Sequence, residues 1–246
     1  MRIFTIMIVD ESDLKVKRVV KEPRISLTMI SRYPNATEKG KQRILLGCKY
    51  PPEYIPRFYE MARKLICELF AGNFIDQHDL YFDEFSRQAK IWKKEALAYP
   101  ENKDDHKNRI FSAKGLDGII AMSSLLNPIL ENYILTNNLR RKQSAIIKNE
   151  VKIGAMADML LADQLDEQIG FLKFNFSSEK LKREEAEIKL YVLKTYFETQ
   201  GLKLYPKSCM LVDVAARRIY TIADIKNCEQ ILNHATIEIF NLWDTV

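Results

Sequence analysis

The sequence predicts an α+β protein, in which a mostly helical N-terminal portion packs on a core with a central mixed sheet flanked by helices. Apolar residues recur every three to four positions from about residue 26 to residue 98, which is the period of amphipathic helices. After residue 138 the pattern changes to short apolar runs separated by polar breaks, which is typical of strands. Glycine and proline number only 8 each, too few for a turn-rich all-β sandwich.

The N-terminal portion comprises residues 1–113, and its first expected element is a strand. Residues 2–9 (RIFTIMIV) are rich in β-branched side chains, which favour strands. The basic and weakly patterned residues 15–24 follow, and they predict a loop or an edge strand.

Two long helices are expected next. Pro51-Pro52 mark the start of the first helix, since proline fits the first turn, and Gly72-Asn73 mark its end. Residues 77–97 carry the apolar period of the second helix. The polar residues 99–108 after it predict a surface loop or a linker.

The core comprises residues 114–246 and alternates helices with strands. The helical period resumes near Gly118, breaks at Asn127-Pro128 and ends near Leu135. We then expect three antiparallel strands in a meander, a charged helix, a pair of strands and a closing amphipathic helix. In chain order, these elements are residues 143–148, 151–162, 169–176, 178–200, 208–214, 217–222 and 224–242.

Length and composition exclude several classes of protein. A chain of 246 residues forms one large domain or two small ones, and it needs neither disulfides nor a structural metal. The four cysteines and three histidines are scattered without zinc-binding spacing, and reduced thiols predict a cytoplasmic protein. No signal peptide or membrane span is expected, because the apolar N-terminal run is short and polar residues interrupt the longest later one.

The charge balance permits an anionic partner such as DNA without requiring one. Lysine and arginine number 38 against 33 acids, which gives a net charge of +5. Basic residues cluster at 15–21, 140–142, 180–183 and 217–218. On one shared face these clusters would follow a nucleic-acid backbone, whereas on separate faces each would be an ordinary solvated surface.

Two charged side chains interrupt apolar strands of the core. Asp158 follows Gly154 in one expected strand, and Lys173 lies between Leu172 and Phe174 in the next. A buried charge is costly unless it is paired or binds a metal ion. The two residues therefore predict either a cross-strand ion pair or part of a functional site.

Three more residues complete this pattern. Glu187 and Tyr191 lie four positions apart on the charged helix, and hence on one face of it. Glu131 is an acid within an otherwise apolar helix before the strands. Each has an ordinary alternative. Glu187 would lie on a solvated helix face, Tyr191 would be a core residue, and Glu131 would cap a turn or face solvent.

In this order, the residues resemble the motifs of the PD-(D/E)XK nuclease superfamily, especially its RecB-like exonuclease branch, over about residues 116–222. GAMAD (154–158) is similar to the family's G-x-x-x-D element, FLK (171–173) to its E-x-K element and EIKLY (187–191) to its Q-x-x-x-Y element. The resemblance implies a restriction-endonuclease-like core and hydrolysis of DNA with Mg²⁺ or Mn²⁺.

The resemblance also implies roles for individual residues. Glu131, Asp158 and Glu187 would bind the metal ion, Lys173 would orient the attacking water, and Tyr191 would belong to the catalytic site. Hydrolysis of this kind depends on carboxylates, because they hold the metal ions that lower the pKa of bound water.

One position departs from the family's pattern. Phe171 stands where the E-x-K element has its second carboxylate. In an active enzyme Glu184, Glu185 or Glu187 would replace that carboxylate, and Glu187 is best placed because it lies beside Tyr191. Without a replacement, the protein would be a catalytically inactive module that binds nucleic acid or a protein partner.

Two further alternatives stay open. Asp163 or Asp213 would take over from one of the proposed acids if it lies nearer to Asp158. The second alternative is that the strands form an unrelated accessory sheet on a helical scaffold. The spatial relation of Asp158 and Lys173 distinguishes these alternatives, since a shared site requires both side chains on one face of neighbouring strands.

Overall fold

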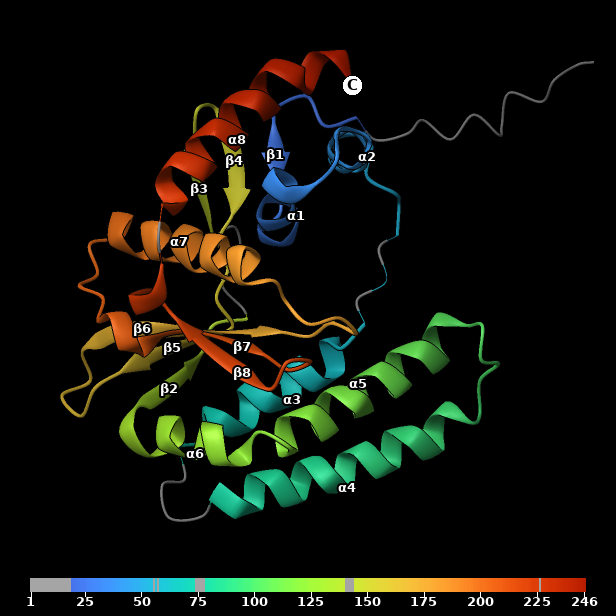
Figure 1. Cartoon of the computed structure of the whole chain (residues 1–246). Helices are drawn as coiled ribbons and strands as arrows, with labels where there is room; N and C mark the ends of the chain where they lie inside the picture. Colours follow the sequence, from blue (N-terminus) through green and yellow to red (C-terminus); the bar gives the residue numbers. More distant parts are fainter. Residues whose placement is uncertain (1–18, 55, 57, 74–77, 140–143, 226) are drawn as a thin grey trace, which may run out of the picture.

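The structure, a computed structural model, confirms an α+β fold with a helical N-terminal part (Figure 1). It describes residues 19–54, 56, 58–73, 78–139, 144–225 and 227–246. The strand expected at residues 2–9 lies outside the described residues, as do residues 15–18 and the basic cluster 140–142. Within the described part of the chain, no helix is long and apolar enough to cross a bilayer.

A mixed five-stranded sheet lies at the centre of the molecule (Figure 1). Its strands, in spatial order, are β2 (Ile134–Asn137), β5 (Met159–Ala162), β6 (Gln168–Asn175), β7 (Cys209–Asp213) and β8 (Arg218–Thr221). β5 and β6 form an antiparallel hairpin, whereas β6 and β7 are parallel and are joined by helix α7 (Arg183–Thr199). A parallel pair needs such a crossover, because a tight turn cannot join strands that point the same way.

A second sheet has three short strands. They are β1 (Arg24–Ile25), β4 (Val151–Gly154) and β3 (Ala145–Lys148), in that spatial order. The strand expected at residues 151–162 is therefore two strands, β4 and β5, which belong to different sheets. The predicted three-stranded meander is wrong, because a continuous apolar run does not reveal where the chain leaves one sheet for another.

Strand β2 was expected to be the end of a helix that reaches Leu135, and this prediction is wrong as well. The preceding helix, α6 (Ser123–Asn132), ends at Tyr133, whose backbone is extended (φ −132°, ψ 147°). Leu135 is buried and pairs with Leu161 of β5. A short apolar run fits a helix or a strand equally well, and here pairing with β5 decides the outcome.

Helices lie on both sides of the central sheet (Figure 1). The α7 side holds α1 (Leu27–Arg32), α2 (Glu38–Lys49), α7 and α8 (Cys228–Leu242). The α3 side holds α3 (Glu60–Phe70), α4 (His78–Ala96), α5 (Asp104–Ile120) and α6. Side chains of β6 alternate between the two apolar cores, so that Phe171 belongs to the α7 side and Leu172 to the α3 side.

The expected boundary between residues 113 and 114 lies inside α5. Helices α1 and α2 belong to the same apolar core as the C-terminal helices α7 and α8, while α3 to α6 form the other core. Each core therefore combines residues from both expected portions of the chain.

Several helix boundaries differ from expectation. α3 begins after Tyr59, not at Pro51-Pro52, because Tyr59 has a left-handed backbone (φ 68°) that does not continue as a helix. Pro128 lies inside α6, and the chain breaks near Ala121 instead. The segment 99–108 is a loop only as far as the start of α5. α4, α7 and α8 all fall within their expected ranges.

Candidate functional site

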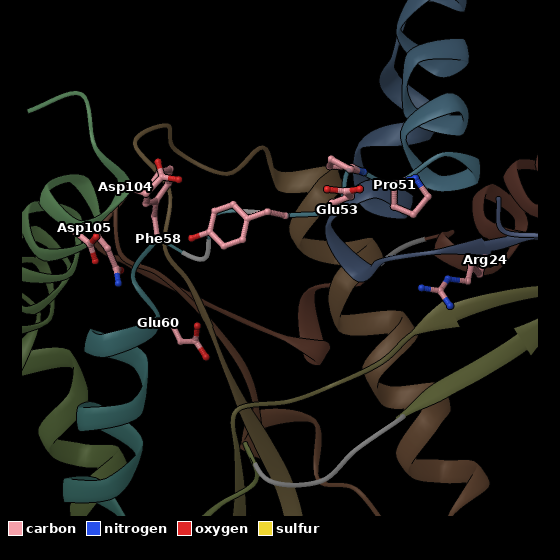
Figure 2. Close-up of a pocket in the computed structure, with 10 residues that line it drawn as sticks. Arg24, Pro51, Glu53, Phe58, Glu60, Asp104 and Asp105 are labelled. Carbon is pink, nitrogen blue, oxygen red and sulfur yellow. The ribbon is translucent and has the colours of Figure 1, made fainter. Parts of the chain in front are cut away.

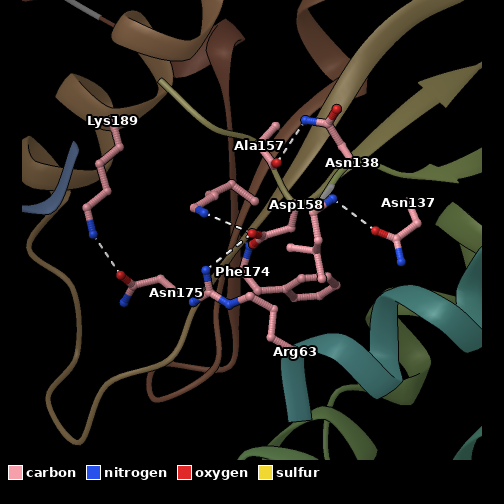
Figure 3. Close-up of polar contacts among 10 residues, drawn as sticks. Arg63, Asn137, Asn138, Ala157, Asp158, Phe174, Asn175 and Lys189 are labelled. Atoms are coloured by element: carbon pink, nitrogen blue, oxygen red, sulfur yellow. Dashed lines mark hydrogen bonds and ion pairs between the residues drawn. The ribbon is translucent and has the colours of Figure 1, made fainter. Parts of the chain in front are cut away.

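Charged side chains surround Asp158 at the point where β4 leads into β5 (Figure 3). The Asp158 carboxylate is fully buried. Its Oδ1 accepts hydrogen bonds from Lys173 Nζ at 2.9 Å and from Arg63 Nη1 at 3.2 Å, and its Oδ2 accepts one from the backbone N–H of Phe174 at 2.8 Å. Two cations therefore share one carboxylate.

The backbone fixes Asp158 in this position. Its N–H donates to the carbonyl of Leu172 at 3.0 Å, next to Lys173 on β6. On the other side, the backbone N–H of Asn138 donates to the Asp158 carbonyl at 2.9 Å, and Asn138 Nδ2 donates to the Ala157 carbonyl at 3.0 Å. Asp158 and Lys173 thus meet on one face of neighbouring strands, which is the arrangement that both an ion pair and a shared site require.

Burial and charge act against each other in this group. Burial lowers the pKa of Lys173, while the Asp158 carboxylate opposes the lowering and the positive charge of Arg63 adds to it. Only 13% of the Lys173 side chain and none of the Asp158 side chain is exposed. Because the single Asp158 carboxylate faces both Lys173 and Arg63, these three side chains together keep an excess of positive charge.

These cations line a pocket of about 330 Å³, which we call the basic pocket. Arg32 of α1, Arg63 of α3, Lys173 of β6 and Lys189 of α7 contribute its positive charge. Ser144, Leu211 and three short segments complete the wall, the segments being residues 26–28, 154–156 and 174–177. No aspartate or glutamate is found in the lining formed by the described residues. Such a lining fits an anionic ligand.

Lys189 is the least exposed of these cations, with 3% of the residue exposed. Its Nζ donates to Asn175 Oδ1 at 2.7 Å (Figure 3). Burial lowers the pKa of Lys189 to about 8, and the Glu185 carboxylate opposes the lowering. Behind Asn175, the buried carboxylate of Asp213 accepts hydrogen bonds from the Leu181 N–H at 2.7 Å and from Asn175 Nδ2 at 3.4 Å. Asp213 therefore orients Asn175 toward Lys189.

Sequence reasoning missed Lys189, Arg63 and Arg32. The charged run around Lys189 is typical of a solvated helix face. Its spacing of three residues from Ala186 and from Val192, both buried, is the signal that could have placed it on the inner face. For Arg63 and Arg32 the sequence carries no comparable signal, because the residues they approach are distant along the chain.

Phe171 occupies the place where the resemblance implies a carboxylate. The residue is fully buried in the apolar core of the α7 side. Its ring stacks on that of Phe197 in α7, with centroids 5.2 Å apart and an interplanar angle of 20°. This position is therefore part of the hydrophobic core.

Glu187 and Tyr191 lie on a different face of α7 from Lys189. Each is two residues from Lys189, which corresponds to about 200° around the helix. Glu187 Oε1 accepts a hydrogen bond from Arg183 Nε at 2.8 Å. Tyr191 lines a separate cavity of about 350 Å³ together with Cys228 of α8. Neither residue lines the basic pocket.

The other acids considered from the sequence lie outside the lining of the basic pocket. Glu131 is exposed near the end of α6, on the α3 side of the sheet. Asp163 lies in the β5–β6 turn, where its Oδ1 accepts a hydrogen bond from the Leu165 N–H at 2.9 Å. Glu185 approaches a cation of the basic pocket, with its Oε2 3.8 Å from Arg32 Nε.

In this arrangement Asp158 Oδ1 is already paired with two cations. Both oxygens of Asp158 already accept hydrogen bonds, so a metal ion at Oδ1 would displace Lys173 or Arg63. Over the described part of the chain, no group of three or more His, Cys, Asp and Glu residues is arranged to hold a metal ion. Fixed cations of this kind match an anion instead.

A larger cavity of about 870 Å³ has the opposite charge (Figure 2). Glu53, Glu60, Asp104 and Asp105 line it, and Arg24 lies at its far end in this view. A concentration of carboxylates repels phosphate groups. The basic pocket, and not this acidic cavity, therefore suits a nucleic-acid ligand.

Comparison with known proteins gives no match, either to a family model or to a curated protein sequence. The geometry of the basic pocket is thus the basis for the function proposed below.

Proposed function

We propose that the protein binds nucleic acid through the basic pocket without hydrolysing it, as a metal-independent module built on a nuclease-like core. One observation carries this proposal: Arg63 and Lys173 share the Asp158 carboxylate, and the buried Lys189 lines the same pocket. The fixed positive charges stand where the resemblance implies divalent ions.

The order of elements supports the nuclease-like core. α6, β2, β5, β6, α7 and β7 follow one another along the chain, interrupted by the β3–β4 hairpin. The β5–β6 hairpin carries the Lys173 contact with Asp158, and α7 crosses from β6 to the parallel strand β7. The resemblance implies the same succession of helix, strands, helix and strand.

The charges of the pocket support binding more than hydrolysis. Arginine and lysine hold phosphate oxygens by charge-assisted hydrogen bonds, which require no metal ion. Hydrolysis by metal ions instead needs several carboxylates at one point. Here Asp158 is already paired, and Phe171 fills the place of the second carboxylate.

Metal-dependent hydrolysis of DNA is the second candidate function. The contact between Asp158 and Lys173 favours it, since the resemblance gives these two residues the metal-binding and water-orienting roles. It would require Arg63 to release Asp158, and ligands other than Glu131 and Glu187 to approach the metal ion. Binding without hydrolysis requires no such rearrangement.

Fluorescence anisotropy with labelled DNA in EDTA tests the proposal. We expect binding that weakens as the salt concentration rises. Lys189→Met should weaken binding about tenfold, which corresponds to the loss of one charge-assisted hydrogen bond. Lys90→Met removes the same charge from an exposed position on α4 and should change the affinity less than about twofold.

Three other outcomes of this experiment would contradict the proposal or favour an alternative. Circular dichroism establishes that both variants fold. Equal DNA affinity of the wild-type protein and Lys189→Met would contradict the role of the pocket. No DNA binding at all would overturn the nucleic-acid partner and favour a protein partner. Cleavage of DNA with Mn²⁺ that Asp158→Asn abolishes would favour the second candidate.

A further inference from the structure

We infer that the basic pocket takes a phosphomonoester, the terminal phosphate of a nucleic-acid strand, between the hydroxyl of Ser144 and the ammonium group of Lys189. This inference rests on the proposed function and names the ligand class of that same site. Three properties of the described residues support it, namely an unpaired hydroxyl, a gradient of burial and a surplus of charge.

The unpaired hydroxyl belongs to Ser144, just before β3. Only 8% of Ser144 is exposed, and it lines the basic pocket. Its Oγ is buried and has no hydrogen-bond partner among the described residues. Its backbone is fixed, since the N–H of Ala155 donates to the Ser144 carbonyl at 2.8 Å. Buried hydroxyls are normally paired, because an unpaired one is costly, and a phosphate oxygen would accept this hydrogen bond.

The four cations differ in burial. Lys189 is 3% exposed, and the Lys173 side chain is 13% exposed. The side chains of Arg63 and Arg32 are 27% and 47% exposed. The lysines and Ser144 therefore form the inner part of the pocket, while the arginines lie nearer to its mouth.

This gradient favours the end of a strand over its middle. An internal phosphodiester has a sugar on each side, so it reaches the inner groups only if the strand enters and leaves a pocket of about 330 Å³. That volume lies at the lower end of the range for small-ligand pockets. A terminal phosphate enters such a pocket end-on, and the rest of the strand stays near the arginines.

The charge of the inner part also matches a phosphomonoester. Arg63 and Lys173 together exceed the single charge of Asp158, and Lys189 donates to a neutral amide oxygen of Asn175. Two carboxylates lie just outside the lining, namely Asp213 behind Asn175 and Glu185, whose Oε2 is 3.8 Å from Arg32 Nε near the mouth of the pocket. A phosphomonoester carries up to two negative charges near neutral pH, whereas a phosphodiester carries one. A terminal phosphomonoester therefore balances the positive charge of the pocket better than an internal phosphodiester does.

The test compares single-stranded oligonucleotides of one sequence that end in a 5′-phosphate, a 3′-phosphate or hydroxyl groups only. We expect one phosphorylated form to bind about tenfold more tightly than the hydroxyl-ended form, as measured by fluorescence anisotropy in EDTA. Ser144→Ala and Lys189→Met should each reduce this preference, whereas Lys90→Met should retain it. Ser144→Ala removes only a hydroxyl, so it keeps the test valid if Lys189→Met fails to fold.

Competition distinguishes the source of the phosphate. Inorganic phosphate and a nucleoside monophosphate should displace the oligonucleotide only at much higher concentrations than the phosphorylated oligonucleotide itself. Displacement at equal concentrations would overturn the nucleic-acid strand as the source. Equal affinity for phosphorylated and hydroxyl-ended strands would overturn the inference and leave the proposed function intact. Failure of every oligonucleotide to bind would overturn both.

Discussion

At the scale of single residues, Lys189 differs most from an ordinary surface lysine. The residue is buried, and its Nζ donates to the neutral amide oxygen of Asn175. Its pKa is lowered from 10.5 to about 8 because burial disfavours the charged form. A charge kept in this state reduces stability, and a bound anion would offset that cost.

The lowered pKa of Lys189 gives the stability a defined pH dependence. Between about pH 8 and pH 10.5 the unfolded chain binds more protons at this residue, so the free energy of unfolding rises with pH. The difference between the two pKa values corresponds to a total rise of about 3 kcal/mol in the free energy of unfolding across this pH range. Urea unfolding at about pH 7 and about pH 10 should show a smaller rise in Lys189→Met than in the wild-type protein. The same rise in both proteins would contradict the lowered pKa.

Phe171 provides a second prediction at this scale. Phe171→Glu, which restores the acid of the E-x-K element, should lower the free energy of unfolding by at least about 3 kcal/mol, because it places a carboxylate in an apolar core. Phe171→Leu keeps the position apolar and should cost about 1 kcal/mol. Denaturant midpoints measure both effects. A Phe171→Glu variant as stable as the wild-type protein would mean that this position accepts a carboxylate.

At the scale of elements, the register of β6 depends on a close backbone approach. A Cβ atom at Gly170 would clash with the carbonyl oxygen of Ser208, just before β7. The N–H of Tyr205 donates to the Ile169 carbonyl at 2.8 Å in the same region. Glycine at this position therefore lets β6 approach the backbone just before β7 closely, and β6 also carries Lys173.

Gly170→Ala should lower the free energy of unfolding by at least about 2 kcal/mol, because backbone must move to admit the methyl group. Gly47→Ala is the matched control in α2, where an added Cβ meets nothing within 4 Å. It should raise stability by up to about 1 kcal/mol through helix propensity. Chemical denaturation of both variants measures the two changes in the free energy of unfolding. A Gly170→Ala variant as stable as the wild-type protein, or as stable as Gly47→Ala, would contradict the close approach at Gly170.

The elements that the sequence predicts well are those with long and regular periods. α4, α7 and α8 have enough turns for their apolar faces to be recognised. β2, β4 and β5 have four residues each, and pairing with distant partners decides their state. The switch between sheets at residues 155–158 therefore escaped prediction, although it is what brings Asp158 to Lys173.

At the scale of the whole molecule, the basic pocket assembles from segments that lie far apart in the chain. Asp158 and Lys173 could be paired from the sequence because they lie next to each other on neighbouring strands. Arg63 and Lys189 reach the pocket from helices on opposite sides of the sheet, through packing that no local pattern encodes. Sequence reasoning thus named the pairing of Asp158 and Lys173 as one of its alternatives and missed Arg63 and Lys189 beside it.

The DNA affinity of the wild-type protein, measured by anisotropy in EDTA and in Mn²⁺ at one ionic strength, tests the central claim most directly. If the protein binds nucleic acid as proposed, Arg63, Lys173 and Lys189, which line the basic pocket, supply the positive charge that metal ions supply in a nuclease. The dissociation constants should therefore agree within about twofold, and the DNA should stay intact. Binding that requires Mn²⁺, or cleavage that requires Mn²⁺ and is lost in Asp158→Asn, would contradict metal-independent phosphate binding.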